Sequence, residues 1–268
     1  MTRRARVDAE LVRRGLARSR QQAAELIGAG RVSINGMPAA KPATAVSVTA
    51  TLTVDADERS WVSRGAHKLL GALDRFALAV DGRRCLDAGA STGGFTEVLL
   101  DRGAREVVAV DVGYGQLAWP LRRDPRVTVM ERTNVRELTA DAIGGTVDLV
   151  VADLSFISLA TVLPALTSCA APDADIVPMV KPQFEVGKDR VGAGGVVSDP
   201  GLRTEAVLAV ARRAAELQWH TVAVTASPLP GPSGNVEYFL HLRARTDRAL
   251  HGETLEQAVA RAIAEGPQ

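Results

Sequence analysis

The chain has 268 residues, of which 46% are hydrophobic and 24% are charged. These proportions are typical of a globular protein with a sizeable core, and they exclude a chain that is disordered throughout. The formal net charge of +1 conceals an uneven distribution, because residues 1–41 hold nine basic and three acidic side chains. That segment carries +6 and the remainder −5. A basic segment of this kind indicates a polyanionic partner.

The cysteines and the hydropathy pattern indicate the cellular compartment in which the protein is expected. Cys85 and Cys169 lie far apart in apolar stretches without metal-ligand spacing, and the four histidines show no such spacing either. We therefore expect reduced core thiols, no metal and a cytoplasmic protein. No run of about 18 apolar residues is present, so we expect no stable membrane insertion. The Arg-rich start lacks the apolar core of a secretory signal.

The first elements in chain order are two short helices and a hairpin. A helix is predicted from Asp8 to Gly15 with Asp8 as its N-cap, and Ser19 is expected to cap a second helix that ends at Gly28 to Gly30. The pair Asn35-Gly36 between short apolar segments predicts a hairpin, and alternation continues to Val54.

This order of elements resembles the RNA-binding domain of ribosomal protein S4 over most of residues 3–54. The residues that carry the resemblance are Arg6-Val7-Asp8, Gly15-Leu16-Ala17-Arg18-Ser19-Arg20, Ala23, Leu26-Ile27, Gly30, Val32, Asn35-Gly36 and Lys41-Pro42. Guanidinium groups suit phosphate oxygens and can stack on bases, which favours RNA over a solvated basic helix pair without a ligand. The expected RNA contacts in this domain are Arg4, Arg6, Arg18 and Arg20. We assign residues 1–58 to it and residues 59–62 to a linker.

Strands alternate with helices in the remaining residues, 63–268. Strands are predicted at Arg84–Ala88, Val107–Asp111, Val127–Met130, Val147–Ala152, Ile176–Val180, Thr221–Thr225 and near Val236–Leu242, and helices around residues 66–77, 94–102, 158–169, 202–217 and 253–264. This rhythm predicts an α/β domain of Rossmann type, with a mostly parallel seven-stranded sheet, behind the small α+β domain. Ligands of such sheets bind beyond the carboxyl ends of the strands.

A glycine-rich turn follows the first of these strands. It comprises Asp87, Gly89, Ala90, Ser91, Thr92, Gly93, Gly94 and Phe95. A dinucleotide loop would place a glycine at Ser91, and Asp87 would repel a pyrophosphate, whereas it could help to hold a cationic sulfonium ligand. The spacing resembles the cofactor loop of RNA 2′-O-methyltransferases, which favours S-adenosylmethionine over a nicotinamide dinucleotide.

Two further residues are candidates for the cofactor. Asp111 ends the second strand, where a carboxylate can accept both ribose hydroxyls of either cofactor class. Asn134 follows the third strand and could pair with the adenine edge, although an ordinary loop asparagine is an equal alternative.

Four charged residues point to the reaction. Lys68, Asp153, Lys181 and Glu237 stand on separate predicted elements, and each alone could be a surface charge. Together they resemble the Lys-Asp-Lys-Glu tetrad of FtsJ-like ribose methyltransferases. Methylation of a base nitrogen would favour an aromatic Asn/Asp-Pro-Pro-Tyr/Phe motif where this chain has Asp153-Leu154-Ser155-Phe156. A hydroxyl acceptor is therefore favoured.

The chemistry of a hydroxyl acceptor needs a base. A ribose hydroxyl is a poor nucleophile, and a neutral amine can take its proton whereas an ammonium cannot. Desolvation and a second lysine favour the neutral amine, while carboxylates fix its position. We assign Lys181 as the base, Lys68 as its electrostatic tuner, and Asp153 and Glu237 as orienting carboxylates.

Basic residues on predicted loops surround these four. Arg64, Arg132, Arg136 and Lys188 would suit an RNA backbone near the site, with scattered surface charge as the alternative. The glycine-rich segment Phe184–Pro200 could form a mobile loop over the substrate.

The complete pattern resembles the TlyA family along nearly its whole length. The specific strings are Ser63-Arg64-Gly65-Ala66-His67-Lys68-Leu69, Asp87 to Phe95 and Lys181-Pro182-Gln183-Phe184-Glu185. The resemblance implies a class I methyltransferase fold and S-adenosylmethionine-dependent 2′-O-methylation of cytidines in ribosomal RNA of bacterial ribosomal subunits. It also implies a link to susceptibility to capreomycin- and viomycin-type antibiotics. We expect a monomer. Some members carry a haemolysin label, so a membrane-active haemolysin is the alternative, and an NAD-dependent oxidoreductase is a third.

Overall fold

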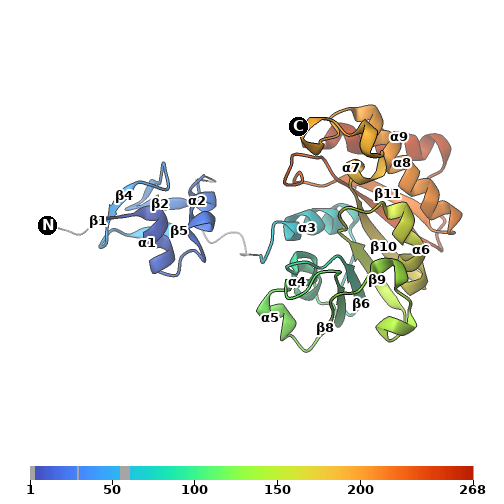
Figure 1. Cartoon of the computed structure of the whole chain (residues 1–268), viewed down its shortest axis with the longest axis horizontal. Coiled ribbons are helices and arrows are strands. Elements are labelled where there is room, and N and C mark those ends of the chain that lie inside the picture. The colour runs from blue at the N-terminus through green and yellow to red at the C-terminus, as the bar shows by residue number, and fades with distance from the viewer. Residues whose placement is uncertain (1–3, 29, 55–60, 268) are drawn as a thin grey trace. The chain divides into compact units, whose positions relative to one another are not determined.

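The computed structural model describes residues 4–28, 30–54 and 61–267. Contacts divide the chain into two units, Met1–Ser60 and Trp61–Gln268 (Figure 1). The elements of the first unit are β1 (Arg4–Arg6), α1 (Val7–Arg13), α2 (Arg20–Gly28), β2 (Val32–Ile34), β3 (Met37–Pro38), β4 (Ala45–Ser47) and β5 (Leu52–Val54). Strands β1 and β4 form one antiparallel pair, and β3, β2 and β5 form a small sheet in that order.

The hairpin in the first unit is confirmed. Asn35 and Gly36 have φ values of 51° and 83°, the left-handed pair that a tight two-residue hairpin requires. Strands β2 and β3 flank this turn in antiparallel register. Ser19 also acts as predicted, because its side chain accepts a hydrogen bond of 3.1 Å from the backbone N–H of Gln22 at the start of α2. Both helices pack on a core that includes Leu11 and Ile27.

The role predicted for Asp8 is wrong. Helix α1 begins at Val7 with Arg6 as the N-cap, and Asp8 lies inside the first turn. Its buried carboxylate accepts hydrogen bonds from the guanidinium groups of Arg6 (2.9 Å) and Arg20 (3.0 Å). The hydrogen bond from Arg6 is the main reason that the pKa of Asp8 lies well below its usual range. Asp8 therefore joins the two helices instead of capping one of them.

The second unit contains the expected alternation of strands and helices. Its elements are α3 (Gly65–Phe76), β6 (Arg84–Ala88), α4 (Gly94–Asp101), β7 (Glu106–Val110), α5 (Trp119–Arg122), β8 (Val127–Met130), β9 (Val147–Ala152), α6 (Leu159–Cys169), β10 (Ala170–Val180), α7 (Pro182–Glu185), α8 (Pro200–Glu216), β11 (His220–Ala226), β12 (Tyr238–Arg243) and α9 (Gly252–Glu265), with short 3-10 turns η1 (Val135–Glu137), η2 (Asp141–Ile143), η3 (Lys188–Arg190) and η4 (Ala193–Gly195).

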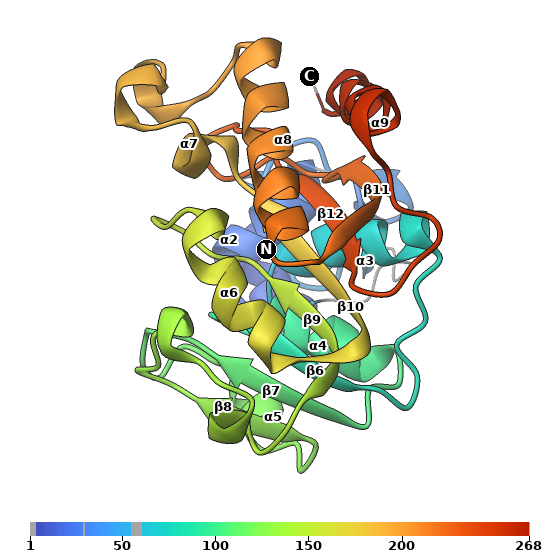
Figure 2. The same cartoon turned by 90° about the vertical axis from the view of Figure 1, so that its right-hand side faces the viewer.

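These strands form one seven-stranded sheet in the order β11-β12-β10-β9-β6-β7-β8, which confirms the predicted α/β fold. Neighbouring strands from β8 to β10 are parallel, and β12 runs antiparallel between β10 and β11. Helices α3 and α4 cover one face and α6 and α8 the other (Figure 2). Strands β7 and β8 lie on one side of β6, and β9 and β10 lie on the other. The strand order therefore reverses at β6, and the ligand crevice is expected between the carboxyl ends of β6 and β9.

Most predicted boundaries in this unit are close to those observed. Three strands, β6, β8 and β9, have the predicted bounds. Strand β7 ends at Val110 and β12 begins at Tyr238, so Asp111 follows one strand and Glu237 precedes the other, contrary to the prediction for both. The part of the expected linker that the structure describes, Trp61 and Val62, packs against the core of the second unit. Cys85 and Cys169 are free and buried, as predicted.

A buried charge cluster joins β10 and β12 at the middle of β10, away from the carboxyl ends of the parallel strands. Asp175 is 3% exposed and accepts hydrogen bonds from His241 Nε2 (2.6 Å) and Arg83 Nη1 (2.5 Å). Burial would raise the pKa of Asp175, but the hydrogen bonds from His241 and Arg83 outweigh it and lower the pKa. This carboxylate fastens the one antiparallel strand to its neighbour.

We expect Asp175→Asn to lower the free energy of unfolding by about 2 kcal/mol, because the amide has one acceptor oxygen in place of the two that His241 and Arg83 use. That corresponds to a fall in Tm of about 4–8 °C for a unit of this size. Asp173→Asn is the matched control, since Asp173 lies on the same strand with 75% of its side chain exposed. Thermal unfolding measures both, and equal Tm values for the two variants would contradict a role for the cluster.

Candidate active site

Two lysine–carboxylate pairs lie at the carboxyl edge of the sheet. Lys68, in the first turns of α3, pairs with Glu237 at 2.5 Å between Nζ and Oε2, and both side chains are almost fully buried. Lys181 directly follows β10 and pairs with Asp153 at 2.6 Å between Nζ and Oδ1. Its Nζ also donates a hydrogen bond of 2.9 Å to Ser155 Oγ. The side chain of Asp153 is 26% exposed, so the second pair reaches the surface.

Strand register explains why these residues meet. Strands β9 and β10 are parallel, with Ala152 beside Pro178, so the residues that follow them, Asp153 and Lys181, emerge at the same edge. Strand β12 is antiparallel to β10 with Tyr238 opposite Val180, so the residue before β12 emerges there too. The structure therefore brings Glu237 to the edge at which Lys181 lies. All four predicted residues come together, as two ion pairs.

The glycine turn packs directly on this edge. Gly89 has φ of 89°, and a side chain there would run into the backbone carbonyl of Asp153. The backbone N–H of Asp153 in turn donates to the carbonyl of Ala88 at 3.0 Å. Glycine is needed at position 89 for both reasons, the positive φ and the close approach of the β9 segment. The turn and the Lys181 pair are thus one packed arrangement.

Asp111 organises the outer side of the turn. Its carboxylate accepts backbone hydrogen bonds from Ser91 (2.8 Å) and Gly113 (2.6 Å). Ser91 has a positive φ of 48°, and its N–H bond to Asp111 holds that conformation. Ser91 and Asp111 are therefore adjacent, as expected of two residues that face one ligand.

Not every residue predicted for the cofactor is open to one. Side chains of Leu117 and Leu121 fill the space beside Gly93, and a side chain at Gly94 would meet Ser63. Phe95 is buried against the core, as Ala90 is. The carbonyl of Thr92 accepts a hydrogen bond from the backbone of Ala118 at 3.1 Å. Ala90, Gly93, Gly94 and Phe95 shape the turn from inside, whereas Thr92 is exposed, and cofactor contacts of all five stay predictions.

Asp87, at the end of β6, is the electrostatically unusual group of the site. It is fully buried, and its Oδ2 accepts a hydrogen bond of 2.6 Å from Thr96. Its Oδ1 has no hydrogen-bond partner among the described residues. Burial, supported by the nearby charges of Asp153 and Asp111, raises the pKa of Asp87 to about 7 although Thr96 opposes the shift. A buried carboxylate with a free oxygen is suited to an amine or another cationic donor.

Asn134 has an observed role in the loop after β8. Its Oδ1 accepts a hydrogen bond of 3.2 Å from the backbone N–H of Arg136 and caps η1, and its Nδ2 donates to Glu137 at 3.2 Å. These bonds support the loop interpretation, and an adenine contact of Asn134 stays a prediction.

Comparison with known proteins agrees with this geometry. Residues 61–244 match the model of the FtsJ-like methyltransferase family, and residues 5–52 match the S4 domain. The chain belongs to the FtsJ-like methyltransferase family. Its N-terminal unit is an S4 domain, and the resemblance to TlyA proteins is confirmed.

Three relatives of this FtsJ-like protein illustrate the range of names and of sequence identities among similar proteins. A 16S/23S rRNA (cytidine-2′-O)-methyltransferase TlyA of Mycobacterium tuberculosis is 78% identical over the whole of both chains. Hemolysin A of Brachyspira hyodysenteriae is 34% identical over 88% of this chain and 98% of that protein. A solved structure described as a hemolysin from Streptococcus thermophilus is 36% identical with a TM-score of 0.74, covering 99% of this chain and 98% of that one.

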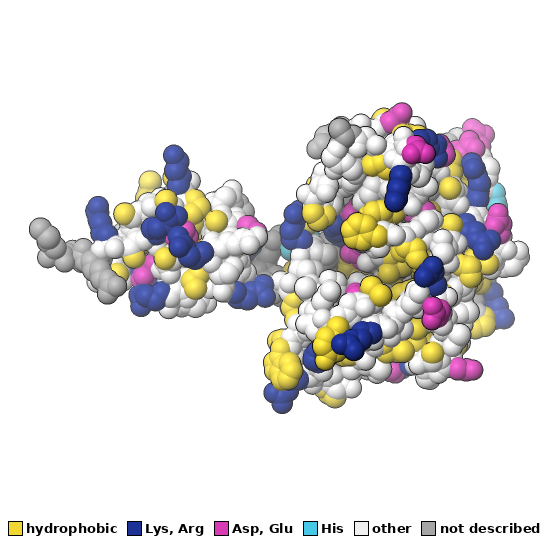
Figure 3. Space-filling view, in the orientation of Figure 1, with side chains coloured by type: hydrophobic (Ala, Val, Ile, Leu, Met, Phe, Trp, Pro, Cys, Tyr) yellow, Lys and Arg dark blue, Asp and Glu magenta, His cyan; other side chains and the backbone are white. Residues whose placement is uncertain are grey.

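The basic residues predicted to bind RNA are all exposed, namely Arg4, Arg6, Arg18, Arg20, Arg64, Arg132, Arg136 and Lys188. Figure 3 shows basic side chains spread over the visible face of the S4 domain. In the FtsJ-like domain, Arg64 precedes α3, Arg132 and Arg136 follow β8, and Lys188 follows α7. The guanidinium of Arg132 lies over the ring of Tyr114 at 4.2 Å.

Sequence reasoning missed three residues of this edge. Asn235 is 3% exposed, accepts from Val197 N–H (2.9 Å) and donates to the Gly195 carbonyl (2.8 Å), so it anchors the glycine-rich loop two residues before Glu237. Phe156 is 91% exposed with φ of 64°. Val112, directly after Asp111, is 76% exposed. Hydrophobic periodicity in the sequence does not reveal a buried amide such as Asn235 or exposed apolar side chains such as Phe156 and Val112. Each of the three residues nevertheless stands close in the chain to a predicted site residue.

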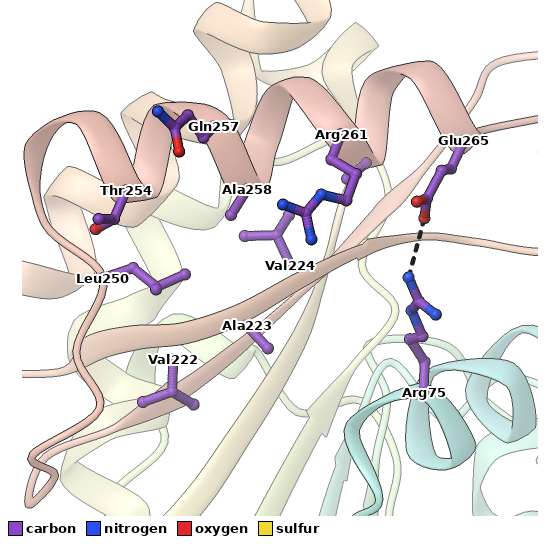
Figure 4. Close-up of a pocket in the computed structure, with 11 residues that line it drawn as sticks. Arg75, Val222, Ala223, Val224, Leu250, Thr254, Gln257, Ala258, Arg261 and Glu265 are labelled. Atoms are coloured by element: carbon purple, nitrogen blue, oxygen red, sulfur yellow. Dashed lines mark hydrogen bonds and ion pairs between the residues drawn. The ribbon is translucent and has the colours of Figure 1, made fainter.

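A cavity of about 370 Å³ lies elsewhere in the domain, between β11 and α9 (Figure 4). Its lining includes Val224 and Leu250 and the ion pair of Arg75 with Glu265 at 3.1 Å. None of the residues predicted for the cofactor or the reaction lines it.

The raised pKa of Asp87 has a consequence for stability. A carboxyl group whose pKa is higher in the folded than in the unfolded protein makes stability fall as pH rises between the two values. These lie at 3.8 and about 7 here, and Asp87→Asn removes the effect. We expect the variant to gain stability relative to the parent between about pH 4 and pH 7, as measured by urea unfolding across that range. A stability difference that does not change with pH would contradict a buried, shifted Asp87.

Proposed function

We propose that this FtsJ-like protein transfers the methyl group of S-adenosylmethionine to the 2′-hydroxyl of cytidine in ribosomal RNA of bacterial ribosomal subunits. The observation that carries the proposal is the pair of lysine–carboxylate contacts, Lys68–Glu237 and Lys181–Asp153, gathered beside the glycine turn. The printed names of relatives, which include rRNA (cytidine-2′-O)-methyltransferases, support the substrate.

The residues around the turn suit S-adenosylmethionine. The unpartnered Oδ1 of buried Asp87 matches a cationic donor such as an amine. Asp111 could accept from ribose hydroxyls in exchange for one of its backbone bonds, and the exposed apolar side chain of Val112 could cover an adenine ring. When bound, S-adenosylmethionine supplies a methyl group made electrophilic by a sulfonium.

The reaction requires the chain's own residues to hold the hydroxyl and take its proton. S-adenosylmethionine held beside Asp87 and Asp111 would supply the methyl carbon to the 2′-oxygen, and its sulfur would keep the electron pair of the carbon–sulfur bond. The proton of the hydroxyl passes to Nζ of Lys181 in its neutral form, which Asp153 and Ser155 hold in place. Lys68, held by Glu237, is assigned the role of electrostatic tuner at this edge. Positioning of this kind contributes about 7 kcal/mol or more in well-oriented reactions.

RNA recognition is assigned to the S4 domain and to the exposed basic residues of the second unit. Arg6 and Arg20 keep 50% and 59% of their side chains exposed while Asp8 orients them, which suits phosphate contacts. Phe156 follows Ser155, which binds Lys181, and its exposed ring is the kind of surface on which an unpaired base stacks. We propose that the protein acts as a monomer in the cytoplasm, with the family's link to capreomycin-type susceptibility.

The haemolysin alternative rests on the names of relatives, three of which are described as hemolysins. In the described part of the chain, no helix combines the length and the apolar character needed to cross a bilayer. The two lysine–carboxylate pairs, Lys68–Glu237 and Lys181–Asp153, give methyl transfer a specific structural basis. Methyl transfer is therefore the function that we propose.

We expect Lys181→Ala to lower the rate of methyl transfer by about 100-fold or more, because the base is removed. The affinity for S-adenosylmethionine should stay within about twofold, since cofactor binding is assigned to Asp87, Asp111 and the glycine turn and not to Lys181. Mass spectrometry of rRNA nucleosides and calorimetric titration provide the two measurements. Arg212→Ala, an exposed cation on α8, is the control. Normal activity of Lys181→Ala would show that another group takes the proton.

We expect the double substitution of Arg6 and Arg20 by Gln to weaken RNA binding and to lower its salt dependence. Each phosphate that the variant no longer neutralises reduces the slope of log K against log salt by about 0.7–0.9. The same change at Arg212 and Arg213 of α8 removes an equal charge far from the S4 domain in sequence and is the control. Filter binding across a salt series measures the slopes, and equal slopes for the two double variants would rule out a phosphate-binding role for Arg6 and Arg20.

A further inference from the structure

Glu185 holds two neighbouring segments of the active-site edge together. It is the last residue of α7, the short helix that begins directly after Lys181. Its Oε2 accepts a hydrogen bond from Ser158 Oγ (2.6 Å) and its Oε1 accepts one from the Leu159 backbone N–H (2.8 Å). Both oxygens are thus bonded at the N-terminal end of α6, where a negative charge is favourable.

These bonds complete a closed loop of contacts around Lys181. The segment between β9 and α6 is fastened at its start, because Lys181 Nζ binds Asp153 and Ser155. The same segment is fastened at its end by Glu185, four residues after Lys181 in the chain. The two fastenings fix the register between the segment that carries Asp153 and the segment that carries Lys181.

Phe156 lies between the two fastenings in a strained conformation. Its φ of 64° is unfavourable for a side chain with a Cβ, and its ring is 91% exposed. Such backbone persists only where the surrounding contacts impose it. The ring centroid of Phe184, next to Glu185 in α7, lies 5.3 Å from that of Phe156. The ring of Phe156 therefore contacts the short helix whose last residue, Glu185, is bonded to Ser158 and Leu159.

We propose that Glu185 is a positioning residue for methyl transfer, which fixes Lys181, Asp153 and Phe156 relative to one another through Ser158 and Leu159. This inference rests on the proposed function. Glu185 lies on the segment after β10, whereas Asp87 lies at the end of β6 and Asp111 directly follows β7, so its removal should affect turnover and not cofactor affinity.

The test uses the full chain with S-adenosylmethionine and rRNA as substrates, and compares wild type with three variants at position 185. Glu185→Ala removes both bonds and should lower kcat about tenfold or more, with the Kd for S-adenosylmethionine within about twofold of wild type. Glu185→Gln should recover most of kcat, because its carbonyl can accept from Leu159 and its amide can donate to Ser158. Glu205→Ala on α8 removes an exposed carboxylate that pairs with Arg190 and should match wild type.

Glu185→Asp covers the case in which the alanine variant does not fold, as judged by its circular dichroism and cofactor binding. The shorter carboxylate keeps the charge but cannot span both partners, so kcat should fall well below that of Glu185→Gln. Wild-type kcat in Glu185→Ala or in Glu185→Asp would overturn the inference, as would an equal fall in kcat and in cofactor affinity. If the wild-type protein transfers no methyl group to rRNA, both the proposed function and the inference about Glu185 are wrong. If the wild-type protein is active, differences among the variants report on Glu185 alone.

Discussion

Strand β12 enters the sheet antiparallel between β10 and β11, and the arrangement of the active site depends on that pairing. In a purely parallel sheet, only residues that follow strands would reach the carboxyl edge. Here Tyr238 stands opposite Val180, so Glu237 arrives at the edge from the start of a strand, next to the end of β10. Lys68 can then find a buried carboxylate from a helix that precedes the whole sheet in the chain. The buried cluster of Asp175 with His241 and Arg83 secures the same two strands at the middle of β10.

Burial of charge next to the reacting groups is costly, and the structure offsets that cost by pairing. Lys68 and Glu237 are both almost fully buried, and an unpaired member of such a pair would be strongly destabilising. Lys181 is buried to a similar degree, yet its partner Asp153 is partly exposed. The two pairs therefore differ in access, with one enclosed and one reaching solvent. This difference supports the assignment of Lys181, and not Lys68, to the substrate.

Much of the fold and of the site could be predicted from the sequence because both depend on local pattern. The apolar runs of β6, β8 and β9 give their bounds, and Asp153 and Lys181 stand directly after such runs. The rest depends on contacts between segments far apart in the chain. Asp8 has the sequence signature of an N-cap, but the pairing with Arg20 in the next helix decides its role. Asn235 and Glu185 bond to backbone groups of other segments, and no periodicity reports such bonds.

The S4 domain carries an internal anion among its exposed arginines. Asp8 already satisfies two N–H donors of Arg6 and one of Arg20, while each guanidinium has further donors and each side chain stays at least half exposed. In the proposed complex, a phosphate therefore binds to Arg6 and Arg20 in rotamers that Asp8 already holds. Asp8 also compensates part of the positive charge of both side chains. The ordering entropy of binding is reduced, and so is the non-specific attraction for any polyanion. Discrimination between a folded rRNA surface and other nucleic acids then rests on the spacing of phosphates more than on their number.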